Sequence, residues 1–151
     1  MGQAKTLREI IDYAIAKERV ACALYSDAAR EARLPGPKRM LKELSQTEAE
    51  HAKQLKALDL TNIPDAMPED IEDLRIAEFL KDVDLGPDAD LQTILIYAIK
   101  REQASRDFYE AMAQKYDDPA AAKLFTALAA QEKEHKKTLE TVYDEEILRE
   151  N

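Results

Sequence analysis

The sequence is poor in the residues that bind metals through sulfur, cross membranes or form tight turns. A single cysteine, Cys22, excludes an internal disulfide or a Cys-x-x-Cys metal site within these 151 residues. There are only three glycines, which favours long helices over a fold with many turns. No apolar run approaches the length of a membrane span, and the N-terminus lacks the apolar region of a signal peptide. We therefore expect a cytoplasmic protein without a membrane segment.

Composition favours one helical domain spanning residues 1–151. Hydrophobic residues make up 45% of the chain and charged residues 35%, a balance typical of soluble helical proteins. The formal net charge is -9. This charge argues against a nucleic-acid partner, because phosphates are bound by an excess of Lys and Arg.

One pattern of residues occurs twice, 84 positions apart. Each copy has one Glu followed 30 residues later by a Glu-x-x-His pair, giving Glu18, Glu48 and His51 in the first copy and Glu102, Glu132 and His135 in the second. The same offset pairs apolar and aromatic residues without an insertion: Leu7 with Leu91, Ile10 with Ile94, Tyr13 with Tyr97, Tyr25 with Tyr109, and Leu44 with Leu128. Two related helical hairpins, 6–58 and 91–145, are therefore predicted, too few copies for a solenoid.

Apolar residues at helical spacing predict an all-α four-helix bundle. The first helix should run from about Thr6 to Ala32, and Pro35-Gly36-Pro37 should end it and turn the chain. Asp118-Pro119 should start the fourth helix, with Asp as the N-cap. The weaker pattern over 59–90, with a possible short helix at 68–81, suits a long crossover connection between helices 2 and 3.

The six repeated Glu and His residues fall in the middle of the apolar stripes, where a charge is costly unless it is paired or coordinated. Residues three apart lie on one face of a helix, so each Glu-x-x-His pair can reach the same ion. Four carboxylates balance the charge of two divalent cations. Oxygen and nitrogen ligands favour iron or manganese over a structural zinc site, and they also allow manganese or zinc as substitutes for iron. We predict a site for two metal ions.

Other polar residues are predicted to have no role at this site. Glu50 and Glu134 also repeat, but each precedes a histidine by one residue and should face solvent. Cys22 is expected to be a small buried residue, and the acidic segment 144–146 a solvated helix end.

The doubled Glu and Glu-x-x-His arrangement resembles the ferritin-like superfamily and, within it, the diiron domain of the rubrerythrin family, from about residue 6 to 145. The resemblance implies that Glu18 and Glu102 are terminal ligands, that Glu48 and Glu132 bridge the two irons, and that His51 and His135 bind one iron each. It also implies that Tyr25 and Tyr109 hydrogen-bond to the bridging carboxylates.

Two features depart from the rubrerythrin pattern. The usual rubredoxin module needs four cysteines, whereas this sequence has only Cys22, so electrons are expected from a separate donor such as a rubredoxin. Ser105 stands where rubrerythrins carry an additional glutamate, three residues after Glu102. The expected site is consequently symmetric and closer to that of bacterioferritin.

The resemblance implies an oxidoreductase that reduces hydrogen peroxide or dioxygen in oxidative stress, and at least a homodimer. An alternative is a ferroxidase or iron-binding protein that sequesters or delivers iron without catalytic turnover. A third reading, a metal-free interaction bundle, accounts for neither the expected burial of the six residues nor their duplication.

Overall fold

Four long helices form the bundle. The computed structural model describes residues 6–61, 63, 74–79, 81, 85–86 and 88–149, and every regular element within them is helical. The long helices are α1 (Leu7–Glu31), α2 (Pro35–Ala57), α4 (Leu91–Lys115) and α5 (Pro119–Tyr143); a short α3 (Leu74–Phe79) packs on α4, and a π-helical segment, η1 (Asp144–Leu148), continues α5. None of the helices in the described ranges is long and apolar enough to cross a membrane.

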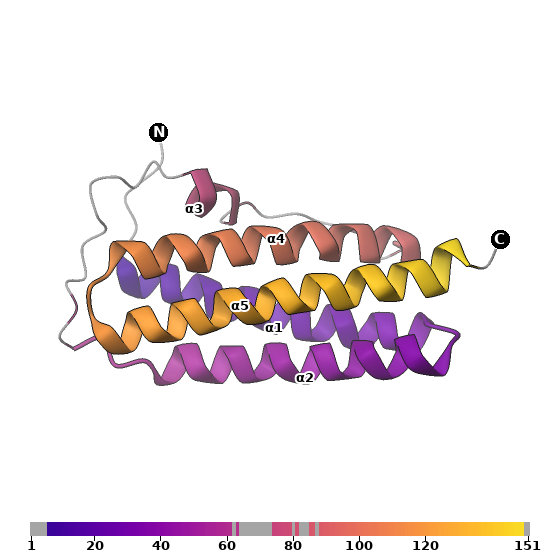
Figure 1. Ribbon diagram of the computed structural model, residues 1–151, viewed down its shortest axis with the longest axis horizontal. Helices are drawn as coiled ribbons and strands as arrows, with labels where there is room; N and C mark the ends of the chain where they lie inside the picture. Colours follow the sequence, from indigo (N-terminus) through magenta and orange to yellow (C-terminus); the bar gives the residue numbers. More distant parts are fainter. Residues whose placement is uncertain are drawn as a thin grey trace.

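The long helices pair as two hairpins, as predicted. Helix α1 packs along α2, and α4 along α5, while α1 meets α4 and α2 meets α5 between the hairpins (Figure 1). The connection from α2 to α4 is the long one and contains α3 (Figure 1). The predicted all-α four-helix bundle with its long crossover is thus confirmed. Of the short helix predicted at 68–81, residues 74–79 are helical and Lys81 is not, while 68–73 and 80 lie outside the described residues.

Local capping explains where the helices begin. Thr6 caps α1 in a capping box with Glu9, and Asp118 caps α5 by accepting from the backbone N–H of Ala121 at 3.0 Å. The prediction for Pro35-Gly36-Pro37 was wrong, because these residues begin α2 and the turn lies before them. Proline suits the first turn of a helix, where its missing N–H has no intrahelical partner to lose.

The start of α2 is capped from the other end of the chain. Its N-cap residue, Leu34, has no side-chain capping bond. Instead the Glu146 carboxylate in η1 accepts from the backbone N–H groups of Leu34 at 2.7 Å and Arg33 at 3.0 Å. A carboxylate is favourable at a helix N-terminus, where N–H groups lack partners. Glu146 is only 2% exposed, so the prediction that 144–146 forms a solvated helix end was wrong for this residue.

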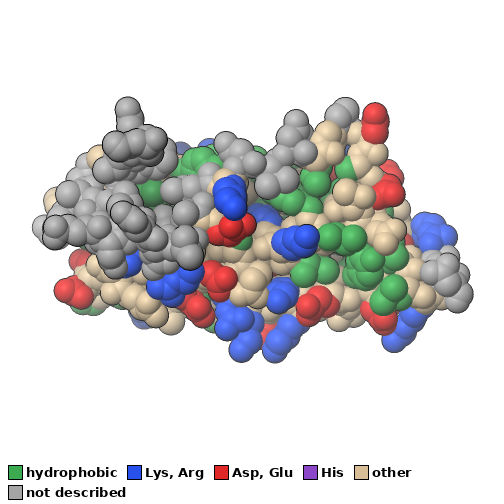
Figure 2. Space-filling view, turned by 90° about the horizontal axis from the view of Figure 1, so that it is seen from above, with side chains coloured by type: hydrophobic (Ala, Val, Ile, Leu, Met, Phe, Trp, Pro, Cys, Tyr) green, Lys and Arg blue, Asp and Glu red, His purple; other side chains and the backbone are tan. Residues whose placement is uncertain are grey.

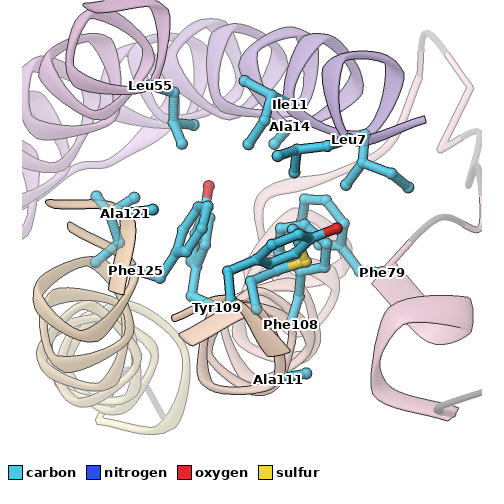
Figure 3. Packing of buried hydrophobic residues seen from close by; sticks show 14 of the residues in the cluster. Leu7, Ile11, Ala14, Leu55, Phe79, Phe108, Tyr109, Ala111, Ala121 and Phe125 are labelled. Carbon is cyan, nitrogen blue, oxygen red and sulfur yellow. The ribbon is translucent and has the colours of Figure 1, made fainter. Parts of the chain in front are cut away.

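The apolar core is divided along the bundle into two clusters. One lies between the N-terminal halves of α1 and α5 and the C-terminal parts of α2 and α4; it contains Leu7, Ile11, Leu55, Phe79, Phe108, Tyr109 and Phe125 (Figure 3). Phe79 brings α3 onto this cluster by stacking on Phe108, with ring centroids 4.0 Å apart. The other cluster occupies the opposite helix ends and contains Tyr25, Ala28, Leu41, Leu44, Leu95, Leu139 and Val142. The residues between the clusters are polar.

Candidate metal centre

The polar layer consists of the six residues singled out by the sequence repeat. Helix α1 contributes Glu18, α2 contributes Glu48 and His51, α4 contributes Glu102, and α5 contributes Glu132 and His135. The two histidine rings stack face to face, with centroids 5.4 Å apart and planes 14° apart. Five of the six side chains belong to residues with no exposed surface, and His135 is 8% exposed. The structure therefore brings all six predicted residues together inside the bundle.

The six residues form two overlapping groups of four that could each hold a metal ion, and a third group joins His51, Glu132 and His135. One group of four contains Glu18, Glu48, His51 and Glu132, and the other contains Glu48, Glu102, Glu132 and His135; within each, one ligand atom from every residue lies within 4.8 Å of the others. Glu48 and Glu132 belong to both groups, whereas each group has its own histidine and its own further glutamate. This sharing is the arrangement that two neighbouring ions joined by two carboxylates require.

Buried polar atoms without hydrogen-bond partners converge on the same space. Among the described residues, the buried side-chain atoms without such a partner are Glu48 Oε1, His51 Nδ1, Glu102 Oε1, Ser105 Oγ, both carboxylate oxygens of Glu132, and His135 Nδ1. All but Ser105 Oγ belong to the six residues. Buried polar atoms are nearly always satisfied in native proteins. A group of unsatisfied oxygen and nitrogen atoms at one place therefore fits divalent cations such as iron or manganese.

A seventh residue, Arg101, lies in the layer and was missed by the sequence analysis. Its guanidinium donates to Glu48 at 2.8 Å, to Glu102 at 3.0 Å and to Glu18 at 3.2 Å. Arg101 is 8% exposed and lies 3.9 Å from a carboxylate oxygen of Glu132. Arginine has several donors in a rigid fork, which allows one side chain to serve three carboxylates.

Two of the carboxylates are stabilised as anions. Burial alone would raise the pKa of Glu18, but the nearby His51 and Arg101 more than offset burial and lower this pKa. Burial likewise opposes ionisation of Glu102, yet Arg101 and His135 lower its pKa to about 2. Both groups are therefore ionised at neutral pH.

The other two carboxylates are favoured as neutral acids. Burial raises the pKa values of Glu48 and Glu132 well above the usual range, and the charges of Glu18 and Glu102 raise them further. Burial disfavours the His51 imidazolium, but the carboxylates of Glu18 and Glu48 overcome this effect and raise its pKa to about 10.

Two buried tyrosines bond to glutamates of the opposite hairpin. Tyr109 on α4 donates to Glu18 on α1 at 2.6 Å, and Tyr25 on α1 donates to Glu102 on α4. The resemblance implied bonds to Glu48 and Glu132, and the structure corrects this assignment. Burial raises the pKa of both tyrosines well above the ordinary value, and the neighbouring carboxylates add to the shift. Both hydroxyls therefore remain protonated donors.

The outer nitrogens of the two histidines have different surroundings. His51 turns Nδ1 toward the glutamates, while its Nε2 contacts Gln131 Oε1 on α5. The repeat places Thr47 at the position corresponding to Gln131, but the Thr47 hydroxyl donates to the Glu43 carbonyl at 2.9 Å. A hydrogen bond on the outer nitrogen orients a metal-ligating imidazole and fixes its tautomer. The two metal-ligand groups are consequently not equivalent.

The remaining candidates lie outside the layer or at its border. Glu50 and Glu134 are exposed, as predicted. Cys22 is only half-buried, with Sγ 3.3 Å from Ser45 Oγ, so the prediction of a small buried residue was wrong. Ser105 is fully buried one turn from Glu102, at the position where the rubrerythrin pattern has a glutamate.

A four-helix bundle with a Glu on each of two helices and a Glu-x-x-His pair on each of the other two is the arrangement of the ferritin-like carboxylate proteins. The family model described as Rubrerythrin matches residues 4–61 and 93–151, which include all six repeated residues. The chain belongs to the rubrerythrin family. No curated protein and no solved structure matches it.

Proposed function

We propose that the protein is a diiron oxidoreductase that reduces hydrogen peroxide or dioxygen. The observation that carries the proposal is the convergence of unsatisfied oxygen and nitrogen atoms from Glu48, His51, Glu102, Glu132 and His135 in a buried layer. Glu48 and Glu132 would bridge the ions, because they belong to both ligand groups. Glu18 with His51, and Glu102 with His135, would complete one ion each.

Two ferrous ions in this site would supply two electrons, enough to reduce hydrogen peroxide to two water molecules or dioxygen to hydrogen peroxide, with two protons taken up in either case. The contribution of the chain is to fix the charge and geometry around them. Tyr25 and Tyr109 each hold one oxygen of Glu102 and Glu18, respectively. The other oxygen of Glu102 has no hydrogen-bond partner and would face a metal, whereas the other oxygen of Glu18 accepts from Arg101 at 3.2 Å. The two apolar clusters border the layer along the bundle and limit water on those sides.

The source of electrons belongs to the same proposal. Within this sequence the lone Cys22 cannot form a rubredoxin site, so a separate donor protein such as a rubredoxin would re-reduce the iron. A reducing compartment such as the cytoplasm would supply both ferrous iron and electrons. We also propose a homodimer or larger homo-oligomer as the working form.

Ser105 favours a second candidate, an iron-oxidising or iron-carrying protein without catalytic turnover. A serine at this buried position provides no additional carboxylate that could exchange with a histidine as the iron changes charge. Such a protein would oxidise ferrous iron with dioxygen and then release or pass it on. The two candidates share one site and differ in whether iron remains bound.

Rapid mixing separates the two candidates. The protein is loaded anaerobically with Fe(II), freed of loose metal, and mixed with hydrogen peroxide or dioxygen while near-ultraviolet absorbance and retained iron are followed. Faster oxidation by peroxide, with iron retained and reducible again, supports the oxidoreductase. Faster oxidation by dioxygen followed by iron loss supports the second candidate.

A matched pair of variants tests the site itself. H135A should lower the iron content below two per chain, whereas E134A, which changes the exposed neighbouring residue, should not. Wild-type protein that retains fewer than about two irons per chain contradicts the site assignment and both candidates.

A further inference from the structure

Arg101 occupies the position of a cation within the candidate metal centre. Its guanidinium lies 2.8 Å from Glu48, 3.0 Å from Glu102, 3.2 Å from Glu18 and 3.9 Å from Glu132. It therefore reaches all four glutamates of the layer, including the two that both ligand groups share. The side chain is 7% exposed and satisfies carboxylate oxygens that would otherwise lack a partner in the metal-free protein.

The corresponding residue of the first hairpin is used differently. The 84-residue repeat aligns Arg101 with Lys17, each directly before a ligand glutamate. Lys17 turns away from the layer: its ammonium donates to the Lys81 carbonyl at 2.7 Å and lies 5.2 Å from the centroid of the Phe79 ring. A cationic side chain next to a ligand glutamate therefore need not enter the layer. Of the two matching cations, only Arg101 in the second hairpin does so.

Arg101 also separates the layer from two cavities, the larger between α4 and the segment that contains α3, and the smaller between α1 and α4. A cavity of about 370 Å³ and another of about 210 Å³ both have Arg101, Lys17 and Tyr97 in their walls. None of the six Glu and His residues lines either cavity. The half-exposed Ile96 lines the larger cavity and Val20 the smaller. Figure 2 looks onto the bundle from the side of α3 and α4, where hydrophobic side chains lie among Lys and Arg.

Arginine and two divalent cations cannot share the layer without strong repulsion. Arginine stays protonated at every physiological pH, so it cannot lose its charge when metal arrives. Its carboxylate partners are the residues that the ions need. Its long, flexible side chain can rotate about its own bonds, and the 370 Å³ cavity beside it has room for a guanidinium.

We propose that Arg101 is a displaceable counter-ion of the metal centre. In the metal-free protein it neutralises the glutamates and closes the layer on this side; when metal binds, it withdraws into the 370 Å³ cavity between α4 and the segment that contains α3. The inference rests on the proposed metal centre. Arg101 would stabilise the fold while the site is empty, and it would lower the affinity for metal and slow its binding.

The test compares R101Q and R101K with K17Q, which removes a cation from the matching position of the other hairpin. Co²⁺ is the probe, because its binding is followed by visible absorption and calorimetry without turnover. Relative to wild type and K17Q, R101Q should unfold at lower urea concentration without metal, and should bind Co²⁺ about tenfold more tightly or better, and faster. A crystal structure of the Co²⁺-loaded wild type should show the guanidinium in the cavity.

R101K keeps a positive charge but cannot donate to three carboxylates at once, so it should fall between wild type and R101Q in both stability and affinity. If R101Q folds only when Co²⁺ is added, the counter-ion role is supported, and the affinity comparison is made on R101K. Co²⁺ affinity of R101Q equal to that of K17Q, or a loaded structure with the guanidinium still on Glu48 and Glu102, overturns the proposal alone. Wild type that binds no Co²⁺ overturns the metal centre as well.

Discussion

The hydroxyl of Tyr109 donates a 2.6 Å hydrogen bond to Glu18, 91 residues earlier in the chain. Tyr25 makes the matching bond to Glu102. Each tyrosine belongs to one of the two apolar clusters and reaches from it into the polar layer, so the layer is bounded by one tyrosine on each side along the bundle. The pair links α1 to α4, which belong to different hairpins.

Replacing Tyr109 with phenylalanine should destabilise the metal-free protein while leaving its packing intact. The ring stays in its cluster, but Glu18 loses a donor in a buried site, which should cost about 1 to 2 kcal/mol of unfolding free energy. Urea unfolding in the presence of a chelator measures this loss. Y97F, which removes a hydroxyl from a half-buried tyrosine of the same helix, should change stability by less than about 0.5 kcal/mol. Equal effects of Y109F and Y97F would contradict the prediction.

The two metal positions should differ in affinity because only His51 contacts a Gln131 side chain. Q131A should weaken binding at the position that includes His51 by about tenfold or more, since the imidazole loses its orienting partner. A calorimetric titration with Mn²⁺ should resolve two steps in the wild type and a changed ratio in Q131A. T47A is the control, because the Thr47 hydroxyl bonds to its own helix. Identical titrations for Q131A and T47A would refute the assignment.

The metal-free protein should lose stability as pH rises above neutral. The pKa of His51 is raised from 6.5 to about 10, so its stabilising effect is fully present below pH 6.5 and is lost as pH rises through 10. The raised pKa values of Glu48 and Glu132 also make the folded state less stable as pH rises above 4.5. Glu102 acts in the opposite direction: with its pKa lowered from 4.5 to about 2, its contribution is present above pH 4.5 and is lost as pH falls through 2.

Stability of the metal-free protein should therefore be greatest near pH 4.5, decline above this pH because of Glu48 and Glu132, and fall by at least about 2 kcal/mol by pH 10, where the effect of His51 is also lost. Urea unfolding at a series of pH values in chelator measures the profile. H51Q should flatten the slope between pH 6.5 and 10. A wild-type slope that persists unchanged in H51Q would show that another group controls it.

Removing the Glu146 carboxylate should destabilise the bundle without affecting metal. E146A leaves the N–H groups of Arg33 and Leu34 without their acceptor at the start of α2, at a cost of about 1 to 3 kcal/mol. E140A, at an exposed position of α5, is the control and should be nearly neutral. Arg33 lies 15 residues from Glu18, about 20 Å along a helix, so Co²⁺ affinity should stay as in the wild type. Weaker metal binding by E146A would mean that the cap and the centre are coupled.

The six candidate ligands could be located from the sequence because helix geometry is regular. A glutamate within an apolar stripe must enter the core, and a Glu-x-x-His pair must present both side chains on one face. Tyr25 and Tyr109 could be singled out, but not their partners. Seven residues separate each tyrosine from the glutamate of its own helix, about 10 Å of helix rise, so its partner lies on another helix and depends on how the four helices are arranged.

Arg101 and Glu146 could not be recognised because their positions depend on tertiary structure. One residue before Glu102 is about 100° around the helix, where a cation ordinarily faces solvent. The sequence pattern that could have pointed to Arg101 is that both ligand glutamates, Glu18 and Glu102, directly follow a cation. This pattern does not identify Arg101, because Lys17 turns away from the layer and Arg101 enters it. Glu146 lies in an acidic segment that ordinarily would be solvated, and η1 brings it to the start of α2.

Each metal-ligand group takes three residues from one hairpin and borrows one glutamate from the other: Glu132 completes the group of Glu18, Glu48 and His51, and Glu48 completes the group of Glu102, Glu132 and His135. Because the exchange is mutual, two identical copies of one such hairpin, related by a two-fold axis, would supply both groups. The chain thus has the arrangement of a symmetric dimer joined into one polypeptide. Because the halves are joined, their sequences can diverge, and the two ions can differ in affinity and in the order in which they bind. Two identical subunits related by exact symmetry could not specify such a difference.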